Sequence, residues 1–202
     1  MFHHNFIVSI TATLAILARP MLVVVASGML LITPVALSDL PPQKLPVYGG
    51  SGGNAFDRDC GAGRVLTGLR FRSGSVLDAV GLLCRPVLSD GKLGPETTVG
   101  SLTGGGGGTS GTASCEAGKV VVAAHIRFGW WVNAVSLYCR NWNASTRTFV
   151  TSPTGQTYKH AGSNFSGNME DEQCESSAQP AHAIRGRSHD FVDAFGLICD
   201  EP

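Results

Sequence analysis

Glycine-rich stretches recur in this sequence at a fixed distance from cysteines. Gly53, Gly108 and Gly167 each lie seven positions before a cysteine, and the first two end the stretches Gly49–Gly53 and Gly104–Gly108. Glycine at such a position either adopts a positive φ in a turn or lets a ligand approach the backbone N–H groups closely. A pentaglycine is often a flexible linker, but its repeated place favours part of a folded unit.

Three turn sequences carry an aspartate or asparagine four positions after their first residue. They are Gly74–Asp78, Gly129–Asn133 and His189–Asp193. A carboxyl or amide side chain in a turn commonly caps its own backbone. It can equally accept hydrogen bonds from a ligand, and both interpretations stay open.

The sequence offers little for catalysis or metal binding. Its histidines show no metal-ligand spacing, no cysteine is left over as a nucleophile, and no G-x-S-x-G elbow occurs. His189 and Asp190 are adjacent, and neighbours on a strand point to opposite faces. We therefore predict no enzymatic activity, no catalytic residue, no metal site and no cofactor.

Six cysteines divide the sequence into three similar units. An offset of 55 positions superimposes the second unit on the first without a gap, and the third unit is a divergent copy. The members of each cysteine pair are separated by 24, 24 and 25 positions, which favours one disulfide inside each unit. A zinc site would need short paired spacings that do not occur. The predicted disulfides are Cys60–Cys84, Cys115–Cys139 and Cys174–Cys199.

Alternating apolar residues predict β-strands in each unit. The segment 64–72 places Val65, Thr67, Leu69 and Phe71 on one face, and 119–127 repeats the pattern. A tight turn then leads into a second strand that ends at the closing cysteine. The residues of the second strands that should point inward are Val80, Leu82, Val135, Leu137, Phe195 and Leu197.

Three units of about four short strands cannot each bury an apolar face alone, so they must pack around a shared axis. This predicts an all-β prism of three sheets with pseudo-threefold symmetry. A three-bladed propeller-like arrangement and a trefoil are the rival architectures.

Three segments carry a resemblance to a known family. Residues 48–57 resemble the glycine-rich opening of jacalin-related lectins, and 72–81 and 186–196 resemble their G-R-S-G-x-x-x-D-A-I-G turn. The resemblance covers about residues 47–199 and implies a β-prism of three four-stranded antiparallel Greek-key sheets. The paired cysteines look more like those of vitelline membrane outer layer proteins, which are secreted three-sheet prisms with disulfides.

The resemblance to jacalin-related lectins implies a sugar site where the first glycine loop meets the last acidic turn. In this sequence it corresponds to Gly49 or Gly50 with Asp193. The carboxylate would accept hydrogen bonds from sugar hydroxyls, and the backbone amides would donate. His189 stands where the family has glycine, and a side chain at this position is expected to narrow or replace the pocket.

The other two turns extend the set of candidates. Gly74 and Asp78 keep the family spacing, so a second or alternative site is expected there. In the middle unit, Trp130 is a candidate platform for a sugar ring, and Trp131 is better explained by packing. The predicted ligand-binding residues are Gly49, Gly50, Gly74, Asp78, Gly129, Trp130, Asn133, His189, Asp190, Phe191 and Asp193.

The N-terminus has the pattern of a cleaved secretory signal peptide over 1–38. Arg19 precedes an apolar run of about a dozen residues, and Ala36-x-Ser38 fits a small-residue cleavage site. Residues 39–46 are expected to be a linker, and 47–202 one domain with units at about 49–87, 104–142 and 163–202. No membrane span is expected after the leader is removed.

Charge argues against a nucleic-acid partner. The chain has fifteen basic and fifteen acidic residues, and only Arg19 of these lies in the leader, so the exported chain is almost neutral. Its lysines are scattered rather than gathered into a basic patch.

Together these features predict a secreted, non-enzymatic protein that binds glycans or glycoproteins through turn loops of the prism. Several sites or a homo-oligomer would raise the avidity of weak single sites. The alternative function is that of an extracellular structural or protein-interaction module like the vitelline membrane proteins, without sugar binding.

Overall fold

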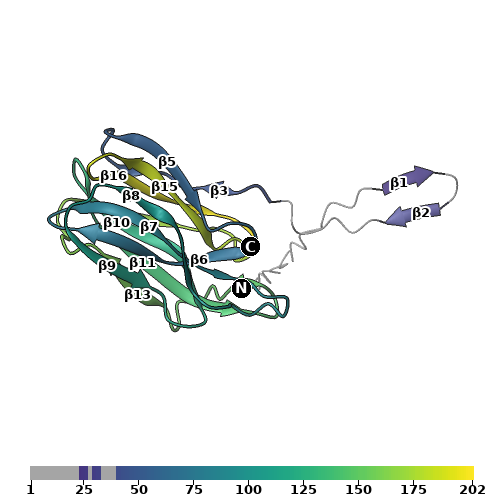
Figure 1. Cartoon of the computed structure of the whole chain (residues 1–202). Coiled ribbons are helices and arrows are strands. Elements are labelled where there is room, and N and C mark those ends of the chain that lie inside the picture. Colours follow the sequence, from purple (N-terminus) through teal and green to yellow (C-terminus); the bar gives the residue numbers. More distant parts are fainter. Residues whose placement is uncertain (1–22, 27–28, 33–39) are drawn as a thin grey trace, which may run out of the picture. The chain divides into compact units, whose positions relative to one another are not determined.

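A computed structural model describes residues 23–26, 29–32 and 40–202. The first two ranges form an antiparallel pair, β1 (Val23–Ala26) and β2 (Met29–Ile32). The predicted signal peptide otherwise lies outside the described residues. Residues 40–202 form a separate unit, which carries all further elements (Figure 1). No helix of the described residues is long and apolar enough to cross a membrane.

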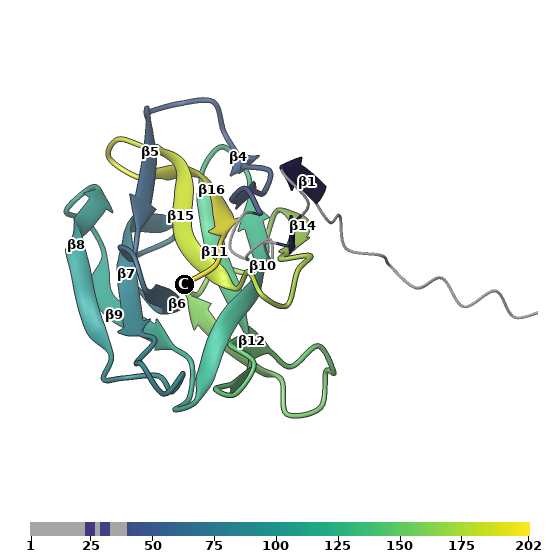
Figure 2. The same ribbon diagram turned by 90° about the vertical axis from the view of Figure 1, so that its right-hand side faces the viewer.

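Three antiparallel sheets make up the unit 40–202, and each is built around a long hairpin (Figures 1 and 2). The first sheet has the order β8 (Thr97–Gly104), β7 (Leu77–Pro86), β6 (Arg64–Ser73) and β9 (Thr109–Ser114). The second has the order β12 (Thr148–Phe149), β11 (Val132–Asn143), β10 (Lys119–Phe128) and β14 (Asn168–Gln173), with β13 (Thr157–Ala161) also on β11.

The third sheet joins the two ends of this unit. Its order is β3 (Gln43–Lys44), β16 (Val192–Cys199), β15 (Ala181–Ser188) and β5 (Asn54–Asp59), with β4 (Tyr48–Gly49) also on β16. Within the segment 39–46, which was expected to be a linker, β3 pairs with β16 and Leu45 is buried. The first sheet has four strands and the other two have five each, because two short strands replace one long edge strand.

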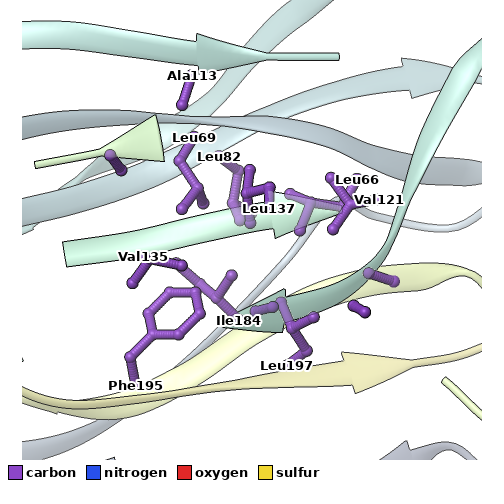
Figure 3. Packing of buried hydrophobic residues seen from close by; sticks show 14 of the residues in the cluster. Leu66, Leu69, Leu82, Ala113, Val121, Val135, Leu137, Ile184, Phe195 and Leu197 are labelled. Carbon is purple, nitrogen blue, oxygen red and sulfur yellow. The ribbon is translucent and has the colours of Figure 1, made fainter. Parts of the chain in front are cut away.

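The inner faces of the three sheets meet in one core (Figure 3). Phe195, Leu137 and Leu82 come from three different sheets and are at most 1% exposed. Burying a side chain of this size stabilises a protein by about 1.5–3 kcal/mol. The inward direction predicted for the second strands is confirmed by these residues.

The alternation predicted for the first strand of each unit is wrong at one position in each strand. A β-bulge lies at Thr67 in β6, at Val122 in β10 and at His182 in β15, where two residues oppose one on the partner strand. The bulge shifts the side-chain alternation by one residue, so Leu66 is as completely buried as Val65. The strands themselves lie where the sequence predicts them.

The three predicted disulfides are confirmed, at Cys60–Cys84, Cys115–Cys139 and Cys174–Cys199. Each first cysteine follows an edge strand of one sheet, and its partner lies on or at the end of the central hairpin of the next. The disulfides therefore connect the third sheet to the first, the first to the second, and the second to the third. Three antiparallel sheets around one core confirm the predicted β-prism.

Candidate functional site

A loop crosses the tip of the central hairpin in each sheet, and all three crossings lie at one end of the prism. We call them the third-sheet site (loop 49–53 with Asp193), the first-sheet site (loop 104–108 with Asp78) and the second-sheet site (loop 162–167 with Asn133). They form a ring, because each loop approaches the tip of the neighbouring hairpin. Loop 49–53 lies against the backbone of Trp130 and loop 104–108 against that of Asp190. In loop 162–167, Asn164 Nδ2 donates to the backbone oxygen of Ser75 at 2.7 Å.

In the third-sheet site the glycine loop lies directly on the carboxylate of Asp193. The backbone N–H of Gly50 donates to the backbone oxygen of Asp193 at 2.8 Å. A Cβ atom at Gly52 would lie 2.5 Å from Asp193 Oδ1, and one at Gly53 would strike Oδ2. Gly53 also has a φ of +61°, which disfavours other residues. Only a loop without side chains can approach the carboxylate this closely.

The carboxylate of Asp193 is buried but incompletely bonded. The residue is 6% exposed, and Oδ2 has no hydrogen-bond partner within residues 40–202. A buried acceptor without a partner costs free energy, about 1–3 kcal/mol for a neutral group and more for a charged one. Asp193 also lines a cleft, so its carboxylate indicates a binding site rather than a turn cap alone.

An arginine behind the loop fixes its path. Arg187 Nε donates to the backbone oxygen of Gly52 at 2.7 Å, and its terminal nitrogen donates to that of Gly53 at 2.6 Å. Arg187 has no role predicted from the sequence. The available signal was its recurrence, because Arg72 and Arg127 occupy the same strand position in the other units.

An aromatic wall borders the third-sheet site. Trp130 is 86% exposed, while Trp131 packs on Phe191 with a distance of 5.1 Å between ring centroids. The two tryptophans come from the hairpin of the second sheet, so the cleft lies between sheets. It measures about 570 Å³ and is lined by Gly50, Ser51, Gly52, Trp130, Trp131 and Asp193.

The first-sheet site repeats the carboxylate geometry. Asp78 is 5% exposed, its Oδ2 also has no partner within 40–202, and a Cβ at Gly107 or Gly108 would strike it. Arg72 Nε donates to the backbone oxygen of Gly107 at 2.6 Å. The neighbouring wall differs, because a Cβ at Gly105 would meet the backbone of Asp190.

The remaining candidates of the acidic turns are placed at the same end. Gly74 lies in the hairpin tip beside Asp78, and an added Cβ there would be 3.8 Å from its carboxylate. His189 and Asp190 point largely into solvent, with side chains 71% and 81% exposed, and their side chains approach each other at 3.3 Å. His189 thus leaves the cleft of the third sheet unfilled.

The second-sheet site is closed by its own side chains. Its loop is one residue longer than the other two and carries side chains at 163–166. Asn133 Nδ2 donates to the backbone oxygen of Ser166 at 2.9 Å, so the amide is engaged with the loop. A Cβ added at Gly129 would meet nothing within 4 Å. The structure therefore brings Gly50, Trp130 and Asp193 together in one site, beside Gly49, and Gly74 and Asp78 together in another. Asn133 lies in the third, closed site.

The three-sheet prism is the fold of jacalin-related lectins. Malaysian banana lectin superimposes with a TM-score of 0.57 at 16% identity, over 80% of this chain and 100% of the lectin. A mannose-binding jacalin-related lectin from Ananas comosus gives 0.53 at 23% identity, over 80% and 99% of the two chains.

Artocarpin complexed with methyl-α-mannose gives a TM-score of 0.55 at 14% identity, over 78% of this chain and 97% of artocarpin. At these identities the similarity establishes the fold. No protein-family model matches the sequence, and no curated protein does so.

Proposed function

We propose that this protein is an exported lectin that binds a sugar residue in the third-sheet site. The observation that carries the proposal is the cleft in which the Asp193 carboxylate lies under a glycine loop and beside an exposed tryptophan. Sugar hydroxyls donate to carboxylates and accept from backbone amides, and an aromatic ring packs on the apolar face of a pyranose.

The first-sheet site is the second binding site in this proposal. Asp78 has the same burial and the same free oxygen, and Arg72 holds its loop as Arg187 holds the other. The backbone of Asp190 rather than a pair of tryptophans borders its loop, so we expect weaker binding there. The second-sheet site, in which Asn133 already bonds its loop, has no place for a sugar.

Export agrees with the three disulfides, which form in oxidising compartments. Because the Ananas lectin binds mannose and artocarpin has been obtained with methyl-α-mannose, mannosides are the first ligands to test. Single shallow sites of this kind typically bind with dissociation constants near ~1 mM, equivalent to about 4 kcal/mol.

A glycan array followed by titration of the best ligand tests the proposal. Asp193→Asn preserves the shape of the side chain and removes its charge, and it should weaken binding at least tenfold. Asp78→Asn should remove only the weaker site. Asn133→Ala, at the same position of the closed site, is the matched control and should bind like the parent. If no glycan binds the parent protein, the proposed lectin function is wrong. That result would favour the alternative of an extracellular structural or protein-interaction module.

A further inference from the structure

The outer face of the second sheet carries two rows of side chains that the sites at the end of the prism do not use. One row crosses four strands as Asp171, His125, Ser136 and His160. His125 Nδ1 lies 2.7 Å from Asp171 Oδ1, and Ser136 Oγ lies 2.7 Å from His160 Nδ1. The neighbouring row contains Gln173, Ala123, Tyr138 and Tyr158.

A groove runs along the second row because Ala123 is small. Strands are about 4.8 Å apart, so Gln173 on β14 and Tyr138 on β11 stand about 10 Å apart across Ala123 on β10. The groove measures about 210 Å³. Its lining residues are Ala123, Tyr138, Arg140, Gln156, Asp171, Glu172 and Gln173.

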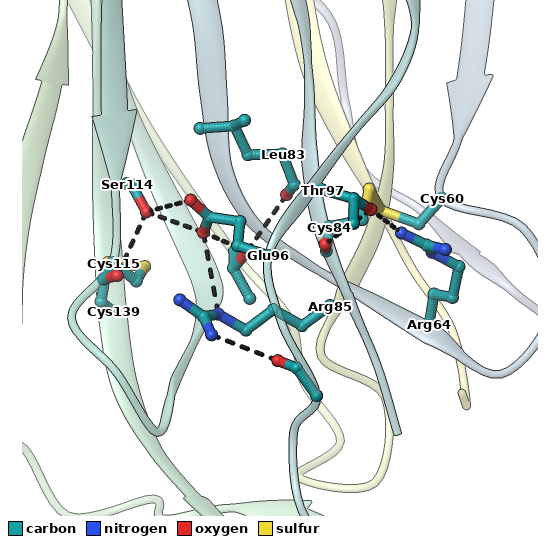
Figure 4. A network of polar contacts seen from close by, with 12 residues as sticks. Cys60, Arg64, Leu83, Cys84, Arg85, Glu96, Thr97, Ser114, Cys115 and Cys139 are labelled. Atoms are coloured by element: carbon teal, nitrogen blue, oxygen red, sulfur yellow. Dashed lines mark hydrogen bonds and ion pairs between the residues drawn. A yellow bond between two sulfur atoms is a disulfide. The ribbon is translucent and has the colours of Figure 1, made fainter. Parts of the chain in front are cut away.

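The first sheet shows what fills the same place when it is closed. Thr97 pairs with Cys84 in the first sheet as Thr157 pairs with Cys139 in the second, so Glu96 and Gln156 are equivalent. The Glu96 carboxylate reaches across the first sheet and accepts hydrogen bonds from Ser114 Oγ and Thr67 Oγ1, both at 2.7 Å (Figure 4).

We call the Glu96 carboxylate in this position the plug. Among the residues around the groove of the second sheet, no side chain repeats it. Gln156 turns to its own edge, where Oε1 accepts from Arg140 Nε at 3.1 Å and Nε2 donates to the Tyr158 hydroxyl at 3.2 Å. Gln173 stands where the first sheet has Ser114, and Val122 replaces Thr67. The groove is therefore open where its counterpart is filled by two oxygen atoms.

We propose that this groove is a separate saccharide-binding site that holds one neutral pyranose residue of a glycan. Its walls provide an aromatic ring at Tyr138, an acceptor at Asp171, donors at Arg140, and an amide at Gln173 that does both. Hydroxyl groups donate and accept alike, so a sugar ring matches this mixture, and one guanidinium opposite one carboxylate gives no preference for a charged ligand.

The tyrosine pair keeps the wall rigid. The rings of Tyr138 and Tyr158 meet edge to face, with centroids 4.7 Å apart. Burial, together with the negative charge of Asp171, raises the pKa of Tyr138, so its hydroxyl stays neutral beside that carboxylate. The groove lies on a sheet face, away from the loops 49–53 and 104–108, so its binding is independent of the proposed function.

The test is a titration of the isotope-labelled chain with simple glycosides, in which the amide chemical shifts are monitored. The probes are the methyl glycosides of mannose, galactose and N-acetylglucosamine at up to ~50 mM, well above millimolar dissociation constants. We expect saturable shifts at Ala123, Tyr138 and Gln173 with at least one probe, and the same shifts in the double variant Asp78→Asn/Asp193→Asn.

The double variant Gln156→Glu/Gln173→Ser introduces the equivalents of Glu96 and Ser114 of the first sheet, and it should weaken binding in the groove at least tenfold. Ala123→Leu fills the floor and should do the same. Met169→Gln, on the same strand but outside the groove, should bind like the parent. If no probe shifts the groove amides, the inference is overturned, and amides of 49–53 that still shift leave the proposed function standing.

Discussion

Gly52 keeps the carboxylate of Asp193 within reach of the backbone because it has no side chain. Gly52→Ala would place a Cβ 2.5 Å from Asp193 Oδ1, so the loop or the carboxylate must move. We expect affinity at the third-sheet site to fall at least tenfold, or about 1.4 kcal/mol. Calorimetric titration in an Asp78→Asn background measures this site alone.

Gly106 provides the matched control, because an added Cβ there would meet nothing within 4 Å. Gly106→Ala should bind and unfold like the parent. If Gly52→Ala also binds like the parent, the close approach of the loop is not required for binding.

Glu172 is a buried carboxyl group on β14 without a hydrogen-bond partner within residues 40–202. Burial raises its pKa to about 8, against the opposing effects of the Leu197 backbone and the Arg185 charge. Between its usual pKa of 4.5 and about 8, the folded state holds a proton that the unfolded state releases. The free energy of unfolding should therefore fall as pH rises through this range, by up to ~1.4 kcal/mol per unit.

Urea unfolding at about pH 5 and about pH 8 measures this contribution, which is fully present below the unfolded pKa. Glu172→Gln cannot ionise and should lack this pH dependence. Its free energy of unfolding should therefore rise relative to that of the parent as pH increases. Glu170→Gln, exposed on the same strand, should follow the parent. Parallel pH profiles of the parent and Glu172→Gln would contradict the prediction.

The glycine loops depend on a strand element behind them, because Arg187 on β15 binds two carbonyls of the loop 49–53. Arg187→Lys keeps the charge but loses the forked geometry. We expect faster amide hydrogen exchange across the loop and sugar binding several-fold weaker. Arg127 makes no hydrogen bond to the loop 162–167 within the described part of the chain, so Arg127→Lys is the control and should leave both loops unchanged. Equal exchange in the parent and Arg187→Lys would show that the loop holds its shape without the arginine.

The positions of the strands were largely predictable from the sequence, but which strands pair with one another was not. Alternation located β6, β10 and the inward residues of β7, β11 and β16. The bulges at Thr67, Val122 and His182 share no residue type, so no local signal marks them. The closure of the second-sheet site depends on one added residue and on the contact of Asn133 with Ser166, which only the folded loop reveals.

At the scale of the whole molecule, the boundaries of the sequence units do not coincide with those of the sheets. The strand before each first cysteine belongs to the sheet of the preceding unit, so β9 joins the first sheet and β14 the second. β5 joins the third sheet and closes the ring between the ends of 40–202. A disulfide inside one sequence unit consequently connects two sheets, which the equal cysteine spacings alone could not indicate.

The ring of disulfides predicts three nearly equal contributions to stability. The closed loops span 24, 24 and 25 positions, so the loop-entropy model assigns each bond about 3 kcal/mol. Replacing each cysteine pair by alanines, one pair at a time, should lower the free energy of unfolding by similar amounts in urea. Two of these bonds, Cys60–Cys84 and Cys174–Cys199, connect to the third sheet, which joins distant ends of the described unit. A markedly larger loss for Cys174→Ala/Cys199→Ala would mean that this disulfide also holds the closing sheet in place, beyond its effect on the unfolded chain.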